Sequence, residues 1–179
     1  FFPLLGRAWA ARAWPTCFQD PWSERVISLV AATRPDIRGR DMGETPAAIY
    51  ALRHLAVVTE IRRYLRTRPT AAVVDLGCGL DRLVGDVGAE DGGASVYALD
   101  FPEVLRLRRT WMGVHERERE LPFSLTDHRW MDEVDASGDL IAVASGVFYF
   151  LDADRVGALV DAMARRFPGG RLVYDAESP

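Results

Sequence analysis

The chain has 179 residues, 49% of them hydrophobic, and a formal net charge of −4. This length suits one well-buried domain, and the mixed, slightly acidic charge argues against a basic face for nucleic acid. The two cysteines, Cys17 and Cys78, have neither disulfide nor zinc spacing, so we expect no metal site and a cytoplasmic protein.

The apolar segments are too short to suggest a membrane protein, because a spanning helix needs about 18 consecutive apolar residues. The first residues are apolar, but Pro3, Gly6 and Arg7 interrupt them and no basic leader precedes them. We therefore expect neither a signal peptide nor a membrane partner. Because the sequence does not begin with Met, its numbering is expected to start inside a longer gene product.

The N-terminal third is predicted to be mainly helical. Residues 1–30 are rich in Trp and Phe and are expected to be partly helical, and residues 31–46 are expected to form a loop rich in proline, glycine and charge. A long helix is predicted from Ala47 to just before Pro69, since apolar residues recur at steps of three and four. Its expected buried stripe is Leu52, Leu55, Val58, Ile61 and Leu65.

From residue 71 onward, short apolar runs alternate with helical patterns. Strands are predicted over 71–77, 95–100, 121–127, 139–145 and 171–176. Helices are predicted over 80–87, 102–114 and 152–167, the last with Asp152 as its N-cap. This alternation predicts an α/β fold: a Rossmann-like, doubly wound, mostly parallel sheet with helices on both faces.

The predicted helix over 102–114 carries a row of basic residues beside an apolar stripe. Its expected buried face is Val104, Leu107, Trp111 and Val114. Arg106, Arg108 and Arg109 alternate with Leu105, Leu107 and Trp111, and we interpret them as the solvated side of the helix rather than as a phosphate-binding patch.

The segment VVDLGCGLDRL, residues 73–83, joins the first predicted strand to the next helix through a glycine turn. Gly77 and Gly79 allow the backbone to turn sharply and to approach a ligand without a Cβ in the way. About 20 residues further on, Asp100 ends the second strand, where an acid can accept hydrogen bonds from ribose hydroxyls. Ligands of such sheets bind beyond the carboxyl ends of the strands, so this turn predicts a nucleotide-like cofactor.

The residues after the second glycine discriminate between cofactors. A dinucleotide fingerprint requires a third glycine where this chain has Arg82, and Asp81 would place a negative charge beside a pyrophosphate. This disfavours NAD and favours S-adenosylmethionine (SAM), whose sulfonium and ammonium groups tolerate a carboxylate. An NAD-dependent oxidoreductase remains a weaker alternative.

Several segments together resemble a known family. In chain order they are PLLGRAWAARA, DPWSERV, VVDLGCGLD, YALDFPEVLRLRR, SLTDHRWMD, SGVFYFLDADRV and RFPGGRLVYDAESP. They are similar to the leucine carboxyl methyltransferase-like and polyketide O-methyltransferase group of class I SAM-dependent enzymes. The resemblance covers nearly the whole chain and is weakest over residues 31–46.

The resemblance implies a set of cofactor-binding residues. It places the glycine turn beside the methionine part of SAM, Asp100 at the ribose hydroxyls and Asp127 at the adenine amino group. Arg53 matches an arginine that pairs with the cofactor carboxylate, and Arg7 matches a basic residue of the N-terminal segment. Neighbouring positions complete the expected set: Asp75, Gly77, Cys78, Gly79, Phe101, Thr126, His128, Ser145 and Gly146.

The implied reaction transfers the SAM methyl group to a carboxyl or hydroxyl oxygen of a small molecule, of the aromatic polyketide type. A carboxylate acceptor needs no base, whereas a hydroxyl acceptor needs one, and His128 is the candidate. Residues 1–46 are expected to form a helical lid on the substrate side, and residues 47–179 a SAM-binding Rossmann-like domain.

Two positions depart from the family pattern. Ser145 stands where the family usually has a glutamate before Gly-Val, and GLDRL stands in place of GLDTR. The chain also stops after the fifth expected strand, whereas such domains usually continue through a sixth and a seventh. An alternative is therefore a remnant of this fold that binds SAM or a partner without catalysis. The oligomeric state is not predicted.

Overall fold

The structure, a computed structural model of the chain, describes residues 2–34, 36–37, 41–87, 93–136 and 139–176. Within these ranges the strands are β1 (Ala72–Leu76), β2 (Val96–Asp100), β3 (Glu118–Pro122), β4 (Leu140–Ala144) and β5 (Arg171–Tyr174). The α-helices are α1 (Phe2–Ala13), α2 (Pro21–Thr33), α3 (Glu44–Leu65), α4 (Leu83–Val87), α5 (Pro102–Met112) and α6 (Ala153–Arg166). Two short 3-10 helices are η1 (His128–Asp132) and η2 (Phe148–Phe150).

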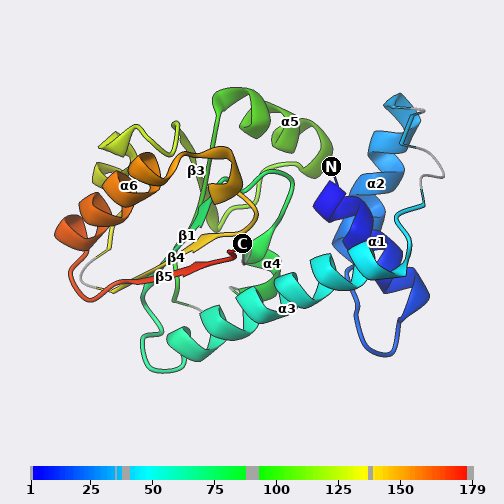
Figure 1. The fold of residues 1–179 in the computed structure, drawn as a ribbon, viewed down its shortest axis with the longest axis horizontal. Coiled ribbons are helices and arrows are strands. Elements are labelled where there is room, and N and C mark those ends of the chain that lie inside the picture. Colours follow the sequence, from blue (N-terminus) through cyan, green and yellow to red (C-terminus); the bar gives the residue numbers. More distant parts are fainter. Residues whose placement is uncertain (1, 35, 38–40, 88–92, 137–138, 177–179) are drawn as a thin grey trace.

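The strands form a parallel sheet in the order β3-β2-β1-β4-β5 (Figure 1). The central strands β1 and β4 are buried along their whole length, as their continuous apolar runs predict. The chain moves outward from β1 to β3 and then returns to the other side of β1. The strand order therefore reverses between β1 and β4, and the predicted α/β fold is confirmed.

Helices cover both faces of the sheet. On one face, α6 and η1 pack through Leu159 and Trp130 against alternate sheet residues such as Val74. On the other face, α3 and α4 pack through Ile61 and Leu83 against the intervening positions. Figure 1 shows α3 and α6 on opposite sides of the sheet. The central strands β1 and β4 thus contribute to both cores, as the alternation of side chains along a strand requires.

The long helix α3 bridges two parts of the molecule. Near its start, Ala47 and Ala51 pack against α1, and a Cβ on Gly6 of α1 would lie 2.4 Å from the Tyr50 ring. Its second half packs on the sheet. The expected stripe is therefore wrong in the first half: Leu52 is 65% exposed, because the helix changes partner along its length.

The predicted buried face of α5 is also wrong. The helix buries Leu105, Arg108 and Met112, whereas Val114 is 77% exposed and lies beyond the helix end. Arg106 and Arg109 are exposed as expected, but Arg108 is 2% exposed. Arg108 can be buried on this face because its guanidinium has polar partners in the glycine turn and on β3.

The third strand begins and ends earlier than predicted. β3 spans Glu118–Pro122, and residues 123–127 form a turn leading into η1 rather than a strand. β3 is an edge strand with one buried residue, Leu121, so its sequence ERELP carries no continuous apolar run. The apolar pattern that predicted 121–127 comes from residues that pack from a loop.

The remaining helical predictions hold with small shifts in their boundaries. Asp152 caps α6, its carboxylate accepting the Arg155 N–H at 2.9 Å. The expected loop 31–46 is shorter, since α2 runs to Thr33 and α3 begins at Glu44; residues 35 and 38–40 of it lie outside the described ranges.

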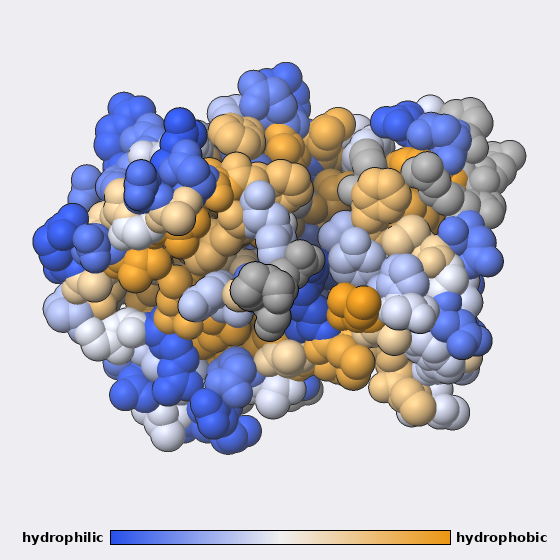
Figure 2. All heavy atoms as spheres, viewed as in Figure 1, coloured by the Kyte–Doolittle hydropathy of each residue, from blue (hydrophilic) through white to orange (hydrophobic). Residues whose placement is uncertain are grey.

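The face of the molecule in Figure 2 has hydrophobic residues over its middle and hydrophilic residues towards its left end. Exposed apolar side chains include Phe150 of η2, at 84%, and Val160 of α6, at 38%. Over the described ranges, we find no helix of the length and apolarity needed to span a bilayer.

Candidate cofactor-binding site

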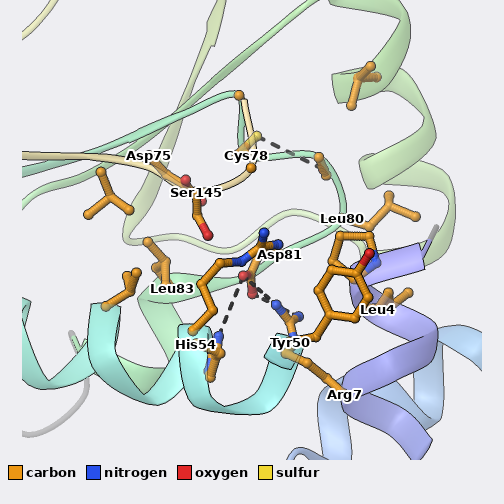
Figure 3. Close-up of a pocket in the computed structure, with 18 of the residues that line it drawn as sticks. Leu4, Arg7, Tyr50, His54, Asp75, Cys78, Leu80, Asp81, Leu83 and Ser145 are labelled. Carbon is orange, nitrogen blue, oxygen red and sulfur yellow. Dashed lines mark hydrogen bonds and ion pairs between the residues drawn. The ribbon is translucent and has the colours of Figure 1, made fainter. Parts of the chain in front are cut away.

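A cavity of about 340 Å³ lies over the carboxyl ends of β1 and β4, where the strand order reverses. This is the position at which open α/β sheets bind their ligands, and the volume lies within the range of roughly 300–1,000 Å³ for small-molecule sites. Figure 3 shows its walls, which come from α1, α3, α5 and the strand ends. Predicted site residues in this lining are Arg7, Arg53, Asp75, Gly77, Cys78, Gly79, Ser145 and Gly146.

The glycine turn forms the floor of the cavity. Gly77 and Gly79 have φ angles of 71° and 51°, in the left-handed region that favours glycine. A Cβ on Gly77 would lie 2.4 Å from the Val147 side chain, so this position requires glycine for packing. A Cβ on Gly79 would meet nothing within 4 Å, so open space borders its backbone.

Asp100 supports this turn from the end of β2. One carboxylate oxygen accepts the Gly79 N–H at 2.8 Å, and the other accepts the Phe101 N–H at 2.7 Å. The acid therefore fixes the turn and also binds the backbone N–H of Phe101, directly before α5. Asp100 and Phe101 adjoin the cavity lining without belonging to it, as defined by the described residues.

Arg7 is buried and makes a network with Asp20 and Ser23 at the start of α2 and with Asp81 of the glycine turn. Its guanidinium binds the Asp81 carboxylate through both Nη atoms, at 2.6 and 3.0 Å, and its Nε lies 2.9 Å from Asp20 and 3.2 Å from Ser23 Oγ. His54 Nδ1 lies 3.6 Å from Asp81 (Figure 3). Burial alone would raise the pKa of Asp81, but the Arg7 charge and the His54 contact hold it well below its usual range.

The opposite wall is held by Arg53. Its Nη1 binds Asp175 at 2.9 Å, and the same carboxylate accepts the Gly146 N–H at 2.7 Å. A Cβ on Gly146 would lie 2.9 Å from Arg53 Nη1, so only glycine lets this guanidinium approach the strand end. Arg53 thus joins α3 to the ends of β4 and β5 while it lines the cavity.

Two buried polar groups lie at the base of the cavity. Burial raises the pKa of Asp75 to about 8, with the Asp81 charge adding to the rise and Arg108 opposing it. The Asp75 side chain is therefore a neutral carboxylic acid at pH 7, able to donate a hydrogen bond. Burial also raises the pKa of Cys78 well above its usual value, so this residue is a thiol rather than a nucleophilic thiolate.

The residues predicted to bind adenine form a separate group after β3. Asp127 starts η1, and its carboxylate binds Arg129 at 2.5 and 2.9 Å. Thr126 and His128 flank it, and all three lie outside the lining drawn from the described residues. The same turn does approach the glycine turn, since Leu125 lies 3.8 Å from the Cβ position of Gly77.

The DRL sequence that departs from the family pattern has a clear structural role. Asp81 binds Arg7, and α4 begins directly after Arg82, at Leu83. Arg82 points away from Asp81: its Nη2 donates to the carbonyls of Met112 and Gly113 at 2.9 Å, and its guanidinium lies 4.2 Å from the centre of the Trp22 ring. It therefore satisfies the exposed carbonyls at the end of α5.

Sequence reasoning missed several residues of this site. Arg108 donates to the Gly79 carbonyl of the turn. Asp20 also binds the Arg7 guanidinium, and Asp175 binds the Arg53 guanidinium. The position of Arg108, three residues after Leu105 and four before Met112, was the available signal, because that spacing places it on the buried face.

A five-stranded order that reverses beside β1, with a ligand-sized cavity at the reversal, is the Rossmann-like arrangement that class I SAM-dependent methyltransferases share. Solved structures with this fold agree. SAM-bound CalS10, an amino pentose methyltransferase from Micromonospora echinaspora, is 21% identical with a TM-score of 0.51, covering 84% of this chain and 56% of its own. N-methyltransferase NodS from Bradyrhizobium japonicum WM9 is 14% identical with a TM-score of 0.50, covering 70% and 68%.

Residues 2–164 match the family model described as leucine carboxyl methyltransferase, and the chain belongs to that family. It is also 27% identical over 117 residues to the tetracenomycin polyketide synthesis O-methyltransferase TcmP of Streptomyces glaucescens. That match covers 65% of this chain and 43% of the relative, so it spans less than half of the relative's length. The predicted family and its cofactor, SAM, are confirmed.

The described residues fit this cofactor. Gly79 presents backbone to open space, a charged guanidinium faces the cavity from α3, and apolar side chains such as Leu80 and Leu107 complete the walls. A ligand with both a charged amino-acid part and apolar surface suits this lining.

Proposed function

We propose that the protein is a SAM-dependent O-methyltransferase acting on a carboxyl or hydroxyl group of a small molecule. The observation that carries this proposal is the cavity at the strand reversal, whose floor is the Gly77–Gly79 turn held by Asp100. The family match and the O-methyltransferase relative support the reaction class. When bound, SAM supplies a methyl group activated by its sulfonium.

Residue roles follow from position and charge. Arg53 is proposed to bind the cofactor carboxylate, exchanging part of its pairing with Asp175, and Asp100 to receive the ribose hydroxyls beside the turn. Gly77, Cys78 and Gly79 contribute backbone. Asp75, Ser145 and Gly146 complete the lining around them.

The residues of the turn after β3 are proposed to receive the adenine. Asp127 accepts from its amino group, with Thr126 and His128 beside it, and Phe101, 56% exposed, lies at the start of α5 on the ribose side. Arg7 acts on the cofactor through Asp81, whose carboxylate lines the cavity.

The acceptor is proposed to be an aromatic polyketide-like acid. The relative's name includes polyketide synthesis, and the apolar side chains of α1 and α5 in the cavity wall suit an apolar acceptor. A carboxylate needs no general base. His128 would serve a hydroxyl acceptor, but it lies outside the described lining, which favours the carboxylate.

Isothermal calorimetry tests the cofactor part of this proposal. Purified protein is titrated with S-adenosylhomocysteine (SAH), the product form of the cofactor, and separately with NAD. Heat from SAH alone supports the proposal, whereas heat from NAD alone overturns it. A labelled-methyl assay with aromatic polyketide acids and matched phenols then identifies the acceptor group.

The second candidate function is a SAM-binding remnant without catalysis, favoured by Ser145, which lines the cavity where the family usually has a glutamate. This candidate predicts SAH binding with no methyl transfer to any acceptor. Transfer by the wild-type chain would exclude it.

A further inference from the structure

Arg108 is a buried cation that no role proposed above uses. It lies on α5 with its side chain 2% exposed, between the sheet and the glycine turn. Its Nη1 donates to the carbonyl of Gly79 at 3.0 Å and to the carbonyl of Asp81, and its Nη2 donates to Glu118 of β3 at 2.9 Å. The glycine turn and β3 therefore meet at one guanidinium of α5.

The charge arrangement explains why an arginine stands there. Moving a guanidinium out of water is unfavourable unless partners compensate it, and Glu118, only 6% exposed, supplies the opposite charge. A lysine has one point of charge, whereas the planar guanidinium donates in fixed, separate directions to Gly79, Asp81 and Glu118.

These bonds control the orientation of the turn. In a trans peptide the carbonyl and the following N–H point to opposite sides. Because Arg108 draws the Gly79 carbonyl toward α5, the Leu80 N–H points to the side away from Arg108. The Asp81 carbonyl is drawn the same way, and the following Arg82 N–H donates to the Asp81 carboxylate at 2.8 Å.

We infer that Arg108 is a positioning residue for the cofactor turn: by holding the Gly79 and Asp81 carbonyls, it determines which peptide groups face the cavity. Asp100 fixes the N–H side of Gly79 and Arg108 fixes its carbonyl side, so the glycine is held from both directions. This inference rests on the proposed function, in which that turn binds SAM.

The test compares Arg108→Met and Arg108→Lys with Arg106→Met, a matched control on the exposed side of the same helix. SAH affinity is measured by calorimetry at a temperature where every variant is folded. Amide hydrogen exchange of residues 77–82 is followed without ligand. Arg108→Met is expected to weaken SAH binding by about tenfold or more, the scale for unsatisfied buried carbonyls, and to accelerate exchange in that segment only.

Arg108→Lys keeps the charge but not the directed donors, so it is expected to fall between Arg108→Met and wild type. Arg106→Met should leave both measurements unchanged. Wild-type affinity in either Arg108 variant, or exchange that rises equally throughout the sheet, would overturn the inference and leave Arg108 a general stabilising residue.

If Arg108→Met does not fold, the SAH affinity and amide exchange of Arg108→Lys test the inference. The exchange measurement needs no ligand, so it also separates the two proposals. Wild-type protein that fails to bind SAH overturns the proposed function, whereas unchanged exchange at residues 77–82 in Arg108→Lys overturns only the positioning role.

Discussion

Arg7 of α1 binds the carboxylate of Asp81 through both Nη atoms, at 2.6 and 3.0 Å, across 74 residues of sequence. The pair joins the N-terminal helices to the turn that forms the cavity floor. Because the Arg7 side chain is 6% exposed, it is shielded from the solvent that weakens surface ion pairs.

Breaking this pair should destabilise the protein strongly. Arg7→Met leaves Asp81 and Asp20 without their cation, and removing one partner of a buried pair typically costs about 3–5 kcal/mol. We expect a loss of that order in the free energy of unfolding, measured by urea denaturation. The double variant Arg7→Met/Asp81→Leu should lose less than the sum of the single changes.

The exposed pair of Arg63 and Glu60 is the control, because the Arg63 side chain is 57% exposed. Arg63→Met is expected to change stability by no more than about 1 kcal/mol. Strict additivity of Arg7→Met and Asp81→Leu would mean that the two side chains are not coupled.

The raised pKa of Asp75 predicts that the stability of the protein depends on pH. Its native pKa is raised to about 8, so the native carboxyl stays protonated where the unfolded chain, with a pKa of about 4, has released the proton. Its contribution to stability is complete below about pH 4 and is lost as the pH rises towards 8.

In the variant Asp75→Asn, the side chain cannot ionise in the native or the unfolded state. This variant therefore does not lose stability through residue 75 as the pH rises. Its stability relative to wild type should therefore improve with rising pH, by up to about 1.4 kcal/mol per pH unit. Denaturation midpoints for both proteins between about pH 5 and about pH 8 measure the difference. Parallel pH profiles would show that Asp75 is ionised in the native protein.

Asp100 should matter more for the ligand than for the fold. Asp100→Ala removes the acceptor of the Gly79 N–H and the expected ribose contact, so SAH binding should weaken by about 1–3 kcal/mol in calorimetry. Asp152→Ala is the control, since the Asp152 carboxylate also accepts a backbone N–H bond but lies at the start of α6. Equal SAH affinity in Asp100→Ala and wild type would remove Asp100 from the site.

Variants of Asp127 and Arg129 test whether Asp127 binds the cofactor or only pairs with Arg129. Hydrogen bonding from Arg129 lowers the pKa of Asp127 to about 2, so the carboxylate is charged at ordinary assay pH and already has a partner. If Asp127 accepts from adenine, Asp127→Ala should weaken SAH binding, whereas Arg129→Ala should not weaken it. Weakening in Arg129→Ala alone would assign the contact to Arg129 instead.

The sequence predicted the parts of this molecule that depend on local periodicity. The central strands were found because both faces are buried and their residues are continuously apolar, and the α6 cap was found because Asp152 precedes a helical stripe. The edge strand β3 was misplaced, since an exposed strand with charged residues has no such pattern.

The sequence predicted many of the residues that line the site, but not which side chains pair with one another. Gly77, Gly79 and Arg53 do line one cavity, yet nothing local to Arg7 reveals that its partner is Asp81. Arg108 was assigned to solvent because a row of arginines is usually solvated, and its partners come from other segments. Pairings over long separations follow from the tertiary fold, which single-sequence patterns do not encode.

The Arg53–Asp175 contact, which spans 122 residues, has a consequence for the order of folding events. Contacts so distant in sequence form only after the intervening chain has been organised, so the cavity wall at β5 is expected to close near the end of folding. A ligand that requires the closed wall would then leave the refolding rate unchanged and slow unfolding. Bound SAM would therefore prolong the lifetime of the folded protein without accelerating its folding.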